Sequence, residues 1–200
     1  MTKDDSQPKF TTVFEERKAP SNRNIPELIR WCKIFADHGL APKENGNYAG
    51  NLSFRTPLGF IITASGADMG HLDENDFTEV FSTESVTKRV IVRGLKEPSS
   101  ESILHDAVYQ YRKDANAVFH GHDELVLKYY QQLDLPITQL EQPFGTIELM
   151  KEVRRILCAR NYIVIKNHGF LSLGIDLEEA GREALRYHCK AVNLIQRPFN

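Results

Sequence analysis

Two strand-like runs joined by a short turn constrain the fold of this 200-residue chain more than any other feature. The run NLSFRT leads into a turn at Pro57-Leu58-Gly59, and the run GFIITAS follows at once. A connection this short predicts a β-hairpin, whose two strands are antiparallel. The hairpin lies among alternating strand-like and helical segments, so a mixed or largely antiparallel sheet covered by helices fits better than a doubly wound parallel sheet.

Helical and strand-like patterns alternate along the rest of the chain. Helices are expected over about residues 24–39, 99–111, 124–133, 146–157 and 177–194. Further strands are expected at TKRVIV, NAVFHGH and YIVIK, and the segment DENDFTEVF predicts a short helix that leads into a strand. The length suits one mixed α/β domain, which we place at residues 25–200.

Residues 1–24 are predicted to form a polar arm outside this domain. They contain Pro8 and Pro20 and show no sustained hydrophobic period. Such a segment is typical of an arm that is mobile or packed on a neighbouring subunit.

Composition excludes several partner classes. The net charge is -2, with Lys+Arg 25 against Asp+Glu 27, so a nucleic-acid partner has no compositional support. The longest apolar runs are far shorter than the roughly 18 residues that cross a bilayer, and the N-terminus has no apolar signal-peptide core. We therefore expect a cytoplasmic protein with no membrane partner. Its three cysteines are widely spaced within apolar helical patterns, and we expect them to be reduced core thiols.

A histidine pair ends one of the predicted strands. His120 and His122 are two residues apart, so both imidazoles point to the same face of the strand and can reach one ion. Such a pair suits zinc or another divalent transition metal, although hydrogen bonds on a surface strand would also satisfy it. His168, which lies between the strand YIVIK and Gly169, is the natural third ligand, whereas taken alone it is more typical of a structural histidine.

Three turns rich in glycine and hydroxyl groups could bind a small anion through backbone N–H groups and side-chain hydroxyls. They are Gly50-Asn51, Ser65-Gly66 and Ser99-Ser100. Each turn taken separately is more typical of ordinary turn and capping chemistry. Glu101 follows the serine pair and would stabilise the first turn of a helix or, beside a metal, act as a general base.

Four other side chains are assigned no part in a site. We expect His71, His105 and His188 to be surface or capping groups and Arg55 to be an exposed strand arginine.

Five segments, taken in order, resemble the class II aldolase/adducin family over about residues 39–194. They are AGNLSFR, ITASG, PSSE, AVFHGH and KNHG, the last followed by a helix. The resemblance implies one mixed α/β domain whose central, largely antiparallel sheet is covered by helices on both faces. It also implies a homotetramer with active sites at subunit boundaries. By position, it implies that His120, His122 and His168 bind zinc, that Glu101 is the acid/base residue, and that the phosphate of a substrate is held by Asn51, Ser65, Gly66, Ser99 and Ser100.

The activity so implied is an aldolase-type cleavage of a ketose phosphate through a metal-stabilised enediolate. Related 4-epimerases carry aspartate at the position of Glu101, so the PSSE form favours an aldolase over an epimerase. Dehydratases and decarboxylases use a similar metal cradle and stay open as alternatives. A non-catalytic adducin-like interaction domain is the remaining alternative, and it lacks the metal-binding residues that this chain retains.

Overall fold

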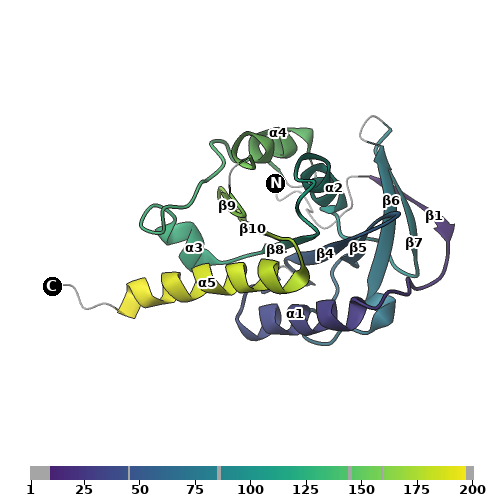
Figure 1. The fold of residues 1–200 in the computed structure, drawn as a ribbon, viewed down its shortest axis with the longest axis horizontal. Coiled ribbons are helices and arrows are strands. Elements are labelled where there is room, and N and C mark those ends of the chain that lie inside the picture. Colours follow the sequence, from purple (N-terminus) through teal and green to yellow (C-terminus); the bar gives the residue numbers. More distant parts are fainter. Residues whose placement is uncertain (1–9, 45, 85–86, 144–145, 159, 197–200) are drawn as a thin grey trace.

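Eight strands form one central sheet in the computed structural model, which describes residues 10–44, 46–84, 87–143, 146–158 and 160–196 (Figure 1). Their order across the sheet is β1-β7-β6-β5-β4-β8-β10-β9. The bounds are Thr11–Glu16 (β1), Asn51–Thr56 (β4), Gly59–Thr63 (β5), Phe77–Glu84 (β6), Arg89–Gly94 (β7), Ala117–Gly121 (β8), Tyr162–Ile165 (β9) and Gly169–Gly174 (β10). Only β1 and β7 pair in parallel among these neighbours, which confirms the predicted mixed, largely antiparallel sheet.

Helices cover both faces of this sheet, as Figure 1 shows. Their bounds are Ile25–Asp37 (α1), Ser102–Tyr111 (α2), Glu124–Tyr129 (α3), Ile147–Ile156 (α4) and Leu177–Gln196 (α5). One buried cluster joins the sheet to α1, α3 and α5, and a second joins the opposite face to α2 and α4. No helix in the described part of the chain is both long and apolar enough to cross a membrane.

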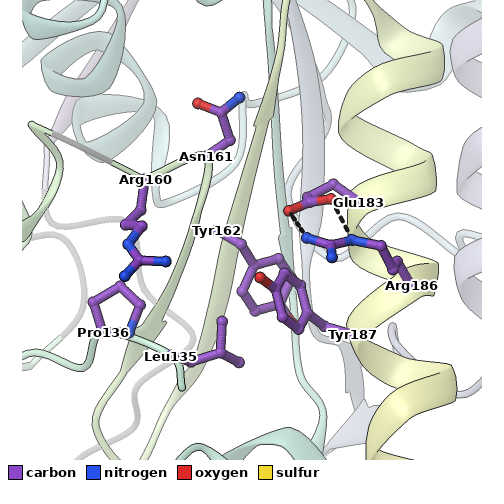
Figure 2. Close-up of a pocket in the computed structure, with 8 residues that line it drawn as sticks. All are labelled: Leu135, Pro136, Arg160, Asn161, Tyr162, Glu183, Arg186 and Tyr187. Atoms are coloured by element: carbon purple, nitrogen blue, oxygen red, sulfur yellow. Dashed lines mark hydrogen bonds and ion pairs between the residues drawn. The ribbon is translucent and has the colours of Figure 1, made fainter. Parts of the chain in front are cut away.

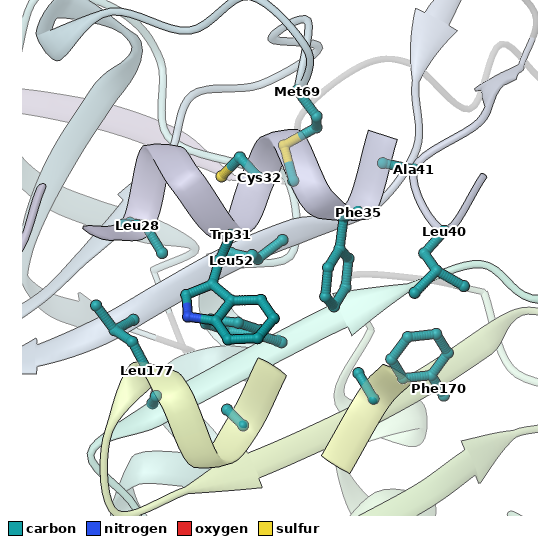
Figure 3. Packing of buried hydrophobic residues seen from close by; sticks show 14 of the residues in the cluster. Leu28, Trp31, Cys32, Phe35, Leu40, Ala41, Leu52, Met69, Phe170 and Leu177 are labelled. Atoms are coloured by element: carbon teal, nitrogen blue, oxygen red, sulfur yellow. The ribbon is translucent and has the colours of Figure 1, made fainter. Parts of the chain in front are cut away.

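The first cluster is built around aromatic rings that α1 directs at the sheet (Figure 3). Trp31 and Phe35 of α1 both meet the ring of Phe119 on β8 edge to face, with ring centroids 6.1 and 5.5 Å apart. A Cβ at Gly181 of α5 would lie 2.3 Å from the indole of Trp31, so only glycine lets α5 approach α1 this closely.

Strand alternation separates apolar from polar side chains at the centre of the sheet. Leu52 and Phe54 of β4 and Phe119 of β8 belong to the cluster under α1 and α5. Ser53 points the other way, toward α2, where it contacts a histidine and a tyrosine of that helix. The polar groups of the central strands therefore collect on the α2 face.

Three short or fully buried strands were not expected from the sequence. β10 reads GFLSLG and is buried throughout, so it lacks the alternation of polar and apolar residues that marks a half-exposed strand. β2 (Lys43–Glu44) and β3 (Asn47–Tyr48) form a separate two-stranded hairpin before β4, and their shortness leaves no period to detect.

The predicted arm over residues 1–24 contains a fourth unexpected strand. β1 pairs with β7 in this same chain and forms one edge of the sheet, and Phe10 just before β1 joins the second apolar cluster. A single edge strand reads as polar because much of it faces solvent, which explains why the sequence suggested an arm. Residues 1–9 lie outside the described part of the chain, and a domain boundary at residue 25 stays a prediction.

The prediction that all three cysteines are core thiols is wrong for two of them. Cys32 of α1 is fully buried, and burial raises the pKa of its thiol. Cys158 and Cys189 are exposed. Cys158 follows the last turn of α4, and Cys189 lies on the outer face of α5. The apolar pattern in the sequence of α5 covers more residues than those that are buried in the structure.

Candidate metal and acid–base site

His120 occupies the end of a strand that is held from both sides. In the sheet it lies opposite Asn51 of β4 and Leu171 of β10. Its side chain is fully buried, and its Nδ1 lies 2.8 Å from the carbonyl oxygen of Phe170. A carbonyl oxygen only accepts hydrogen bonds, so Nδ1 carries the proton and Nε2 presents a lone pair.

The three histidines singled out in the sequence meet at one point. The ring centroids are 5.1 Å apart for His120 and His122, 4.9 Å for His120 and His168, and 5.1 Å for His122 and His168. One nitrogen from each ring lies within 4.8 Å of the others. The structure therefore brings these residues together, and their role as metal ligands stays a prediction.

The turn between β9 and β10 brings His168 to the other two rings. Asn167 adopts a left-handed conformation there, with φ of 56°, and the backbone N–H of His168 donates to the carbonyl of Ile165. Gly169 then passes so close to β8 that a Cβ would lie 2.3 Å from the carbonyl oxygen of Gly121. Glycine at this position lets the two strand ends approach and closes the histidine cluster.

Glu101 places its carboxylate against the same cluster. It precedes α2, is buried, and holds Oε2 3.0 Å from Nε2 of His120, while Oε1 lies 3.5 Å from Nε2 of His168. The side-chain amide of Asn51 donates to Oε2 at 2.8 Å. Burial by itself would raise the pKa of Glu101, but the imidazoles of His120 and His168 and the Asn51 hydrogen bond outweigh it and lower the pKa to about 2.

This arrangement concentrates lone pairs and negative charge in a buried space. Burial lowers the pKa of His120 to about 3, so at neutral pH the ring is uncharged while Glu101 is ionised. Nε2 of His120 and Oε1 of Glu101 are buried and make no hydrogen bond within the described part of the chain. A divalent cation would satisfy Nε2 of His120 and offset the charge of Glu101, and three neutral imidazole nitrogens are the donor set of many zinc sites. The residues present therefore fit a bound metal.

Two loops far apart in the sequence lie together beside Glu101. Ala64 and Pro98 form an antiparallel bridge, and the backbone N–H of Ser65 donates to the carbonyl of Glu97. The turn Ser65-Gly66 thus adjoins the turn Ser99-Ser100 at the beginning of α2. Ser65 and Gly66 are exposed and Ser100 is half-buried, whereas Ser99 is buried and its hydroxyl accepts the backbone N–H of Glu101.

Asn51 lies next to the carboxylate of Glu101 rather than in these two loops. Its amide group contacts Glu101, and its Oδ1 is buried without a hydrogen bond to any described residue. A role in holding phosphate stays a prediction for all five residues assigned to it.

A buried polar network behind Glu101 was missed from the sequence. The hydroxyl of Ser53 lies 2.7 Å from Nδ1 of His105 and 2.7 Å from the hydroxyl of Tyr109. The prediction that His105 is a surface or capping group is wrong, because its side chain is fully buried. A signal was present, since His105 follows Glu101 by four residues and precedes Tyr109 by four, which puts all three on one face of α2.

Two further expectations need correction. His188 of α5 is half-buried and contacts Oδ2 of Asp123 at 2.8 Å, which ties α5 to the beginning of α3. Arg55 is half-buried, and its guanidinium donates to the backbone carbonyls of Tyr109, Arg112 and Ala115 at the end of α2. Both side chains satisfy structural hydrogen bonds that a linear pattern does not reveal. The expectation for His71 is confirmed, because its side chain is exposed.

A separate pocket of about 300 Å³ lies away from the histidine cluster, beside the first residue of β9 (Figure 2). Tyr162 and Tyr187 pack against each other at its centre, with ring centroids 4.5 Å apart. Arg186 is paired with Glu183 on the same helix. None of the residues assigned to the candidate site lines this pocket.

Comparison with known proteins agrees with this geometry. A family model described as Class II Aldolase and Adducin N-terminal domain matches residues 26–129. The L-fuculose phosphate aldolase of Escherichia coli O157:H7 is 30% identical over 175 residues, which cover 80% of this chain and 76% of that protein. Methylthioribulose-1-phosphate dehydratase of Pseudoalteromonas translucida is 25% identical over 189 residues, covering 81% of this chain and 85% of the dehydratase.

A solved structure extends the similarity to the fold. The L-fuculose-1-phosphate aldolase from Thermus thermophilus aligns with a TM-score of 0.71 at 22% sequence identity. The alignment covers 86% of this chain and 92% of that one.

The buried His105 predicts a pH-dependent loss of stability. Burial lowers its pKa from 6.5 to about 4, against the opposing effect of Glu101, so the unfolded chain binds a proton in this range that the folded chain does not. Above pH 6.5 His105 is neutral in both states and does not lower the free energy of unfolding. As the pH falls toward 4, the unfolded chain is favoured because only there is His105 protonated, so the free energy of unfolding decreases. Between pH 7.5 and 5 this decrease amounts to about 2 kcal/mol of the free energy of unfolding. In His105→Gln, the loss of stability over this interval should be smaller by about that amount.

Urea unfolding in excess chelator would measure this difference without metal binding. The exposed His71 provides the control, and His71→Gln should lose as much stability as the wild type over the same interval. An unchanged pH dependence in His105→Gln would show that His105 does not stay neutral in the folded protein.

Proposed function

Because this chain belongs to the class II aldolase and adducin family, we propose that it is a metal-dependent lyase that cleaves a carbon–carbon bond of a ketose phosphate. One observation carries the proposal. Three histidine rings and the buried carboxylate of Glu101 converge on one point, next to two loops that offer hydroxyls and backbone N–H groups. This combination supplies a metal site, a base and an anion site within one cluster.

His120, His122 and His168 are the proposed metal ligands. Zinc is the metal that three imidazoles favour, with a fourth position left to substrate. When bound, the metal would polarise adjacent oxygens of the substrate and stabilise the negative charge that develops on them as the bond breaks. Nδ1 of His120 is held by the carbonyl of Phe170, which keeps Nε2 aimed at the site.

Glu101 is the proposed acid/base residue. Asn51 holds Oε2, whereas Oε1 makes no hydrogen bond within the described residues and is available to a substrate proton. Burial keeps bulk water from competing for that oxygen. In the direction of bond formation the carboxylate would take a proton from the substrate carbon next to the metal-polarised carbonyl, and in the cleavage direction it would return that proton to the same carbon.

The phosphate group of the substrate is assigned to the two loops beside α2. Ser65, Gly66 and Ser100 are accessible there, and the first turn of α2 adds the positive end of a helix dipole. Ser99 and Asn51 would act from the buried side, where each already contacts Glu101. The relatives named for fuculose phosphate and methylthioribulose phosphate support a phosphorylated sugar as the substrate class.

The sequence resemblance supports two further parts of the proposal. They are a homotetramer with active sites at subunit boundaries and a location in the cytoplasm.

A dehydratase is the second candidate, because a methylthioribulose-1-phosphate dehydratase aligns over 81% of this chain. Such an enzyme would use the same metal ligands and the same base but would eliminate water instead of breaking a carbon–carbon bond. An epimerase, a decarboxylase and a non-catalytic adducin-like domain stay open as alternatives within the same family.

Metal content is the first experimental test. The purified wild type should contain about one zinc or similar divalent ion per chain, and the His120→Ala/His122→Ala double variant should lose it. Elemental analysis measures both, with His71→Ala as a control because His71 is exposed. A wild type that binds no divalent metal even after reconstitution would contradict the catalytic proposal and favour an adducin-like binding domain.

Glu101→Gln separates the base from the metal site. Turnover of a ketose phosphate should fall about 10²- to 10⁴-fold because glutamine cannot accept the proton, while metal content stays at the wild-type level. The matched control is Glu79→Gln, which changes a buried carboxylate on β6 that contacts Arg93. Wild-type turnover in Glu101→Gln would rule out the assigned role.

The phosphate assignment predicts an effect that depends on the substrate. The double variant Ser65→Ala/Ser100→Ala removes two accessible hydroxyls, so KM should rise for phosphorylated substrates and stay unchanged for their unphosphorylated analogues. Steady-state kinetics with both substrate forms would measure the difference. An equal change for both forms, or no change for either, would place the phosphate elsewhere.

A further inference from the structure

A small hairpin before β4 reaches the histidine cluster from outside the main sheet. β2 and β3 pair Lys43 with Tyr48 and Glu44 with Asn47. Glu44 extends from this hairpin and places Oε1 3.0 Å from Nδ1 of His122. Its side chain is 50% exposed, whereas the side chain of His122 is only 19% exposed. Glu44, an exposed residue on a two-residue strand, thus contacts the imidazole of His122, one of the proposed metal ligands.

The contact determines which nitrogen of His122 carries the proton. An ionised carboxylate only accepts hydrogen bonds, so Nδ1 of His122 must be the N–H donor. Nε2 then presents its lone pair. A neutral imidazole can bind a metal through either nitrogen, and the partner of the other nitrogen decides which one is used.

The hairpin is anchored at both ends, so the carboxylate is held in place. On one side, the backbone N–H of His122 donates to the carbonyl of Leu40, just before the hairpin. On the other side, the hydroxyl of Tyr48 donates to Asp68 at 2.9 Å, in the segment that follows the Ser65-Gly66 turn. A Cβ at Gly66 would lie 3.3 Å from Oδ1 of Asn47, which shows how closely the hairpin approaches that turn.

We propose that Glu44 is a positioning residue for His122, because its carboxylate accepts from Nδ1 and so holds the ring with Nε2 toward the metal. The proposal rests on the metal binding proposed above and adds to it a residue outside the histidine cluster. The ring of His120 receives its equivalent support from a backbone carbonyl, which no side-chain substitution removes. His122 instead depends on one exposed carboxylate, so its affinity for metal can be altered by a single change at the surface.

Zinc affinity of the whole protein tests this role directly. Competition with a chelator of known affinity would give the dissociation constant for the wild type, Glu44→Ala and Glu44→Gln. Glu44→Ala should raise that constant about 10- to 100-fold, as expected when the partner of a ligand histidine is lost. Glu44→Gln keeps an oxygen that can accept from Nδ1 but removes the charge, so its dissociation constant should lie between the other two.

Two controls separate positioning from general damage. Lys43→Ala changes the neighbouring exposed side chain of the same hairpin and should leave the zinc dissociation constant close to the wild-type value. The midpoint of thermal unfolding of the metal-free protein should be the same for all four proteins, because the Glu44 contact is exposed and contributes little to folding.

The possible outcomes distinguish this proposal from the proposed function. A wild type that binds no zinc overturns both. A wild type that binds zinc with an unchanged constant in Glu44→Ala overturns the role of Glu44 alone. Equal losses in Glu44→Gln and Glu44→Ala would show that Glu44 acts only through its charge and would contradict positioning by a hydrogen bond.

Discussion

The register of β8 between β4 and β10 is the constraint on which the site depends. It places His120 opposite Asn51 on one side and Leu171 on the other, so the amide that steadies Glu101 and the carbonyl that orients His120 both come from neighbouring strands. A slip of one residue would turn His120 into the apolar cluster that contains Phe119 and would separate it from Glu101. The large side chains of that cluster make such a slip costly, because each would be moved to the wrong face of the sheet.

Burial of so many polar groups has an electrostatic consequence. Glu101, His120 and His105 are all buried on the α2 face, and burial alone disfavours the charged form of each. The Asn51 hydrogen bond favours the ionised form of Glu101, whereas burial keeps His105 and His120 neutral. A buried carboxylate and a buried lone pair are unfavourable without a partner, and a bound cation would stabilise both. Metal binding and folding stability should therefore be coupled in this protein.

The sequence predicted those parts of the structure that leave a local pattern. Such a pattern is present in the spacing of His120 and His122, in the strand before His168 and in the serine pair before Glu101. The structure brings these residues together. β10 has no such pattern because it is buried on both faces, and the sequence of β1 indicates a polar arm because an edge strand is largely polar. His105 had a signal in its helical spacing from Glu101, whereas Glu44 had none. The role proposed for Glu44 depends on a contact with a residue 78 positions away, which neither periodicity nor composition encodes.

The same chemical groups serve an aldolase and a dehydratase, so the choice between them lies outside the histidine cluster. Under the proposed function, both reactions would use Glu101 as a base and a metal that stabilises charge on adjacent oxygens. They differ in which bond is aligned to break, and that depends on how the substrate is held by its phosphate and its far end. The phosphate end is assigned to the loops around Ser65 and Ser100, which are joined to β5 and α2 and are fixed by the Ala64–Pro98 bridge. The hairpin that carries Glu44 also contacts the first of these loops through Asn47 and Tyr48. A substitution at Glu44, Asn47 or Tyr48 would therefore change contacts of the candidate metal site or of the adjoining loop from one short segment.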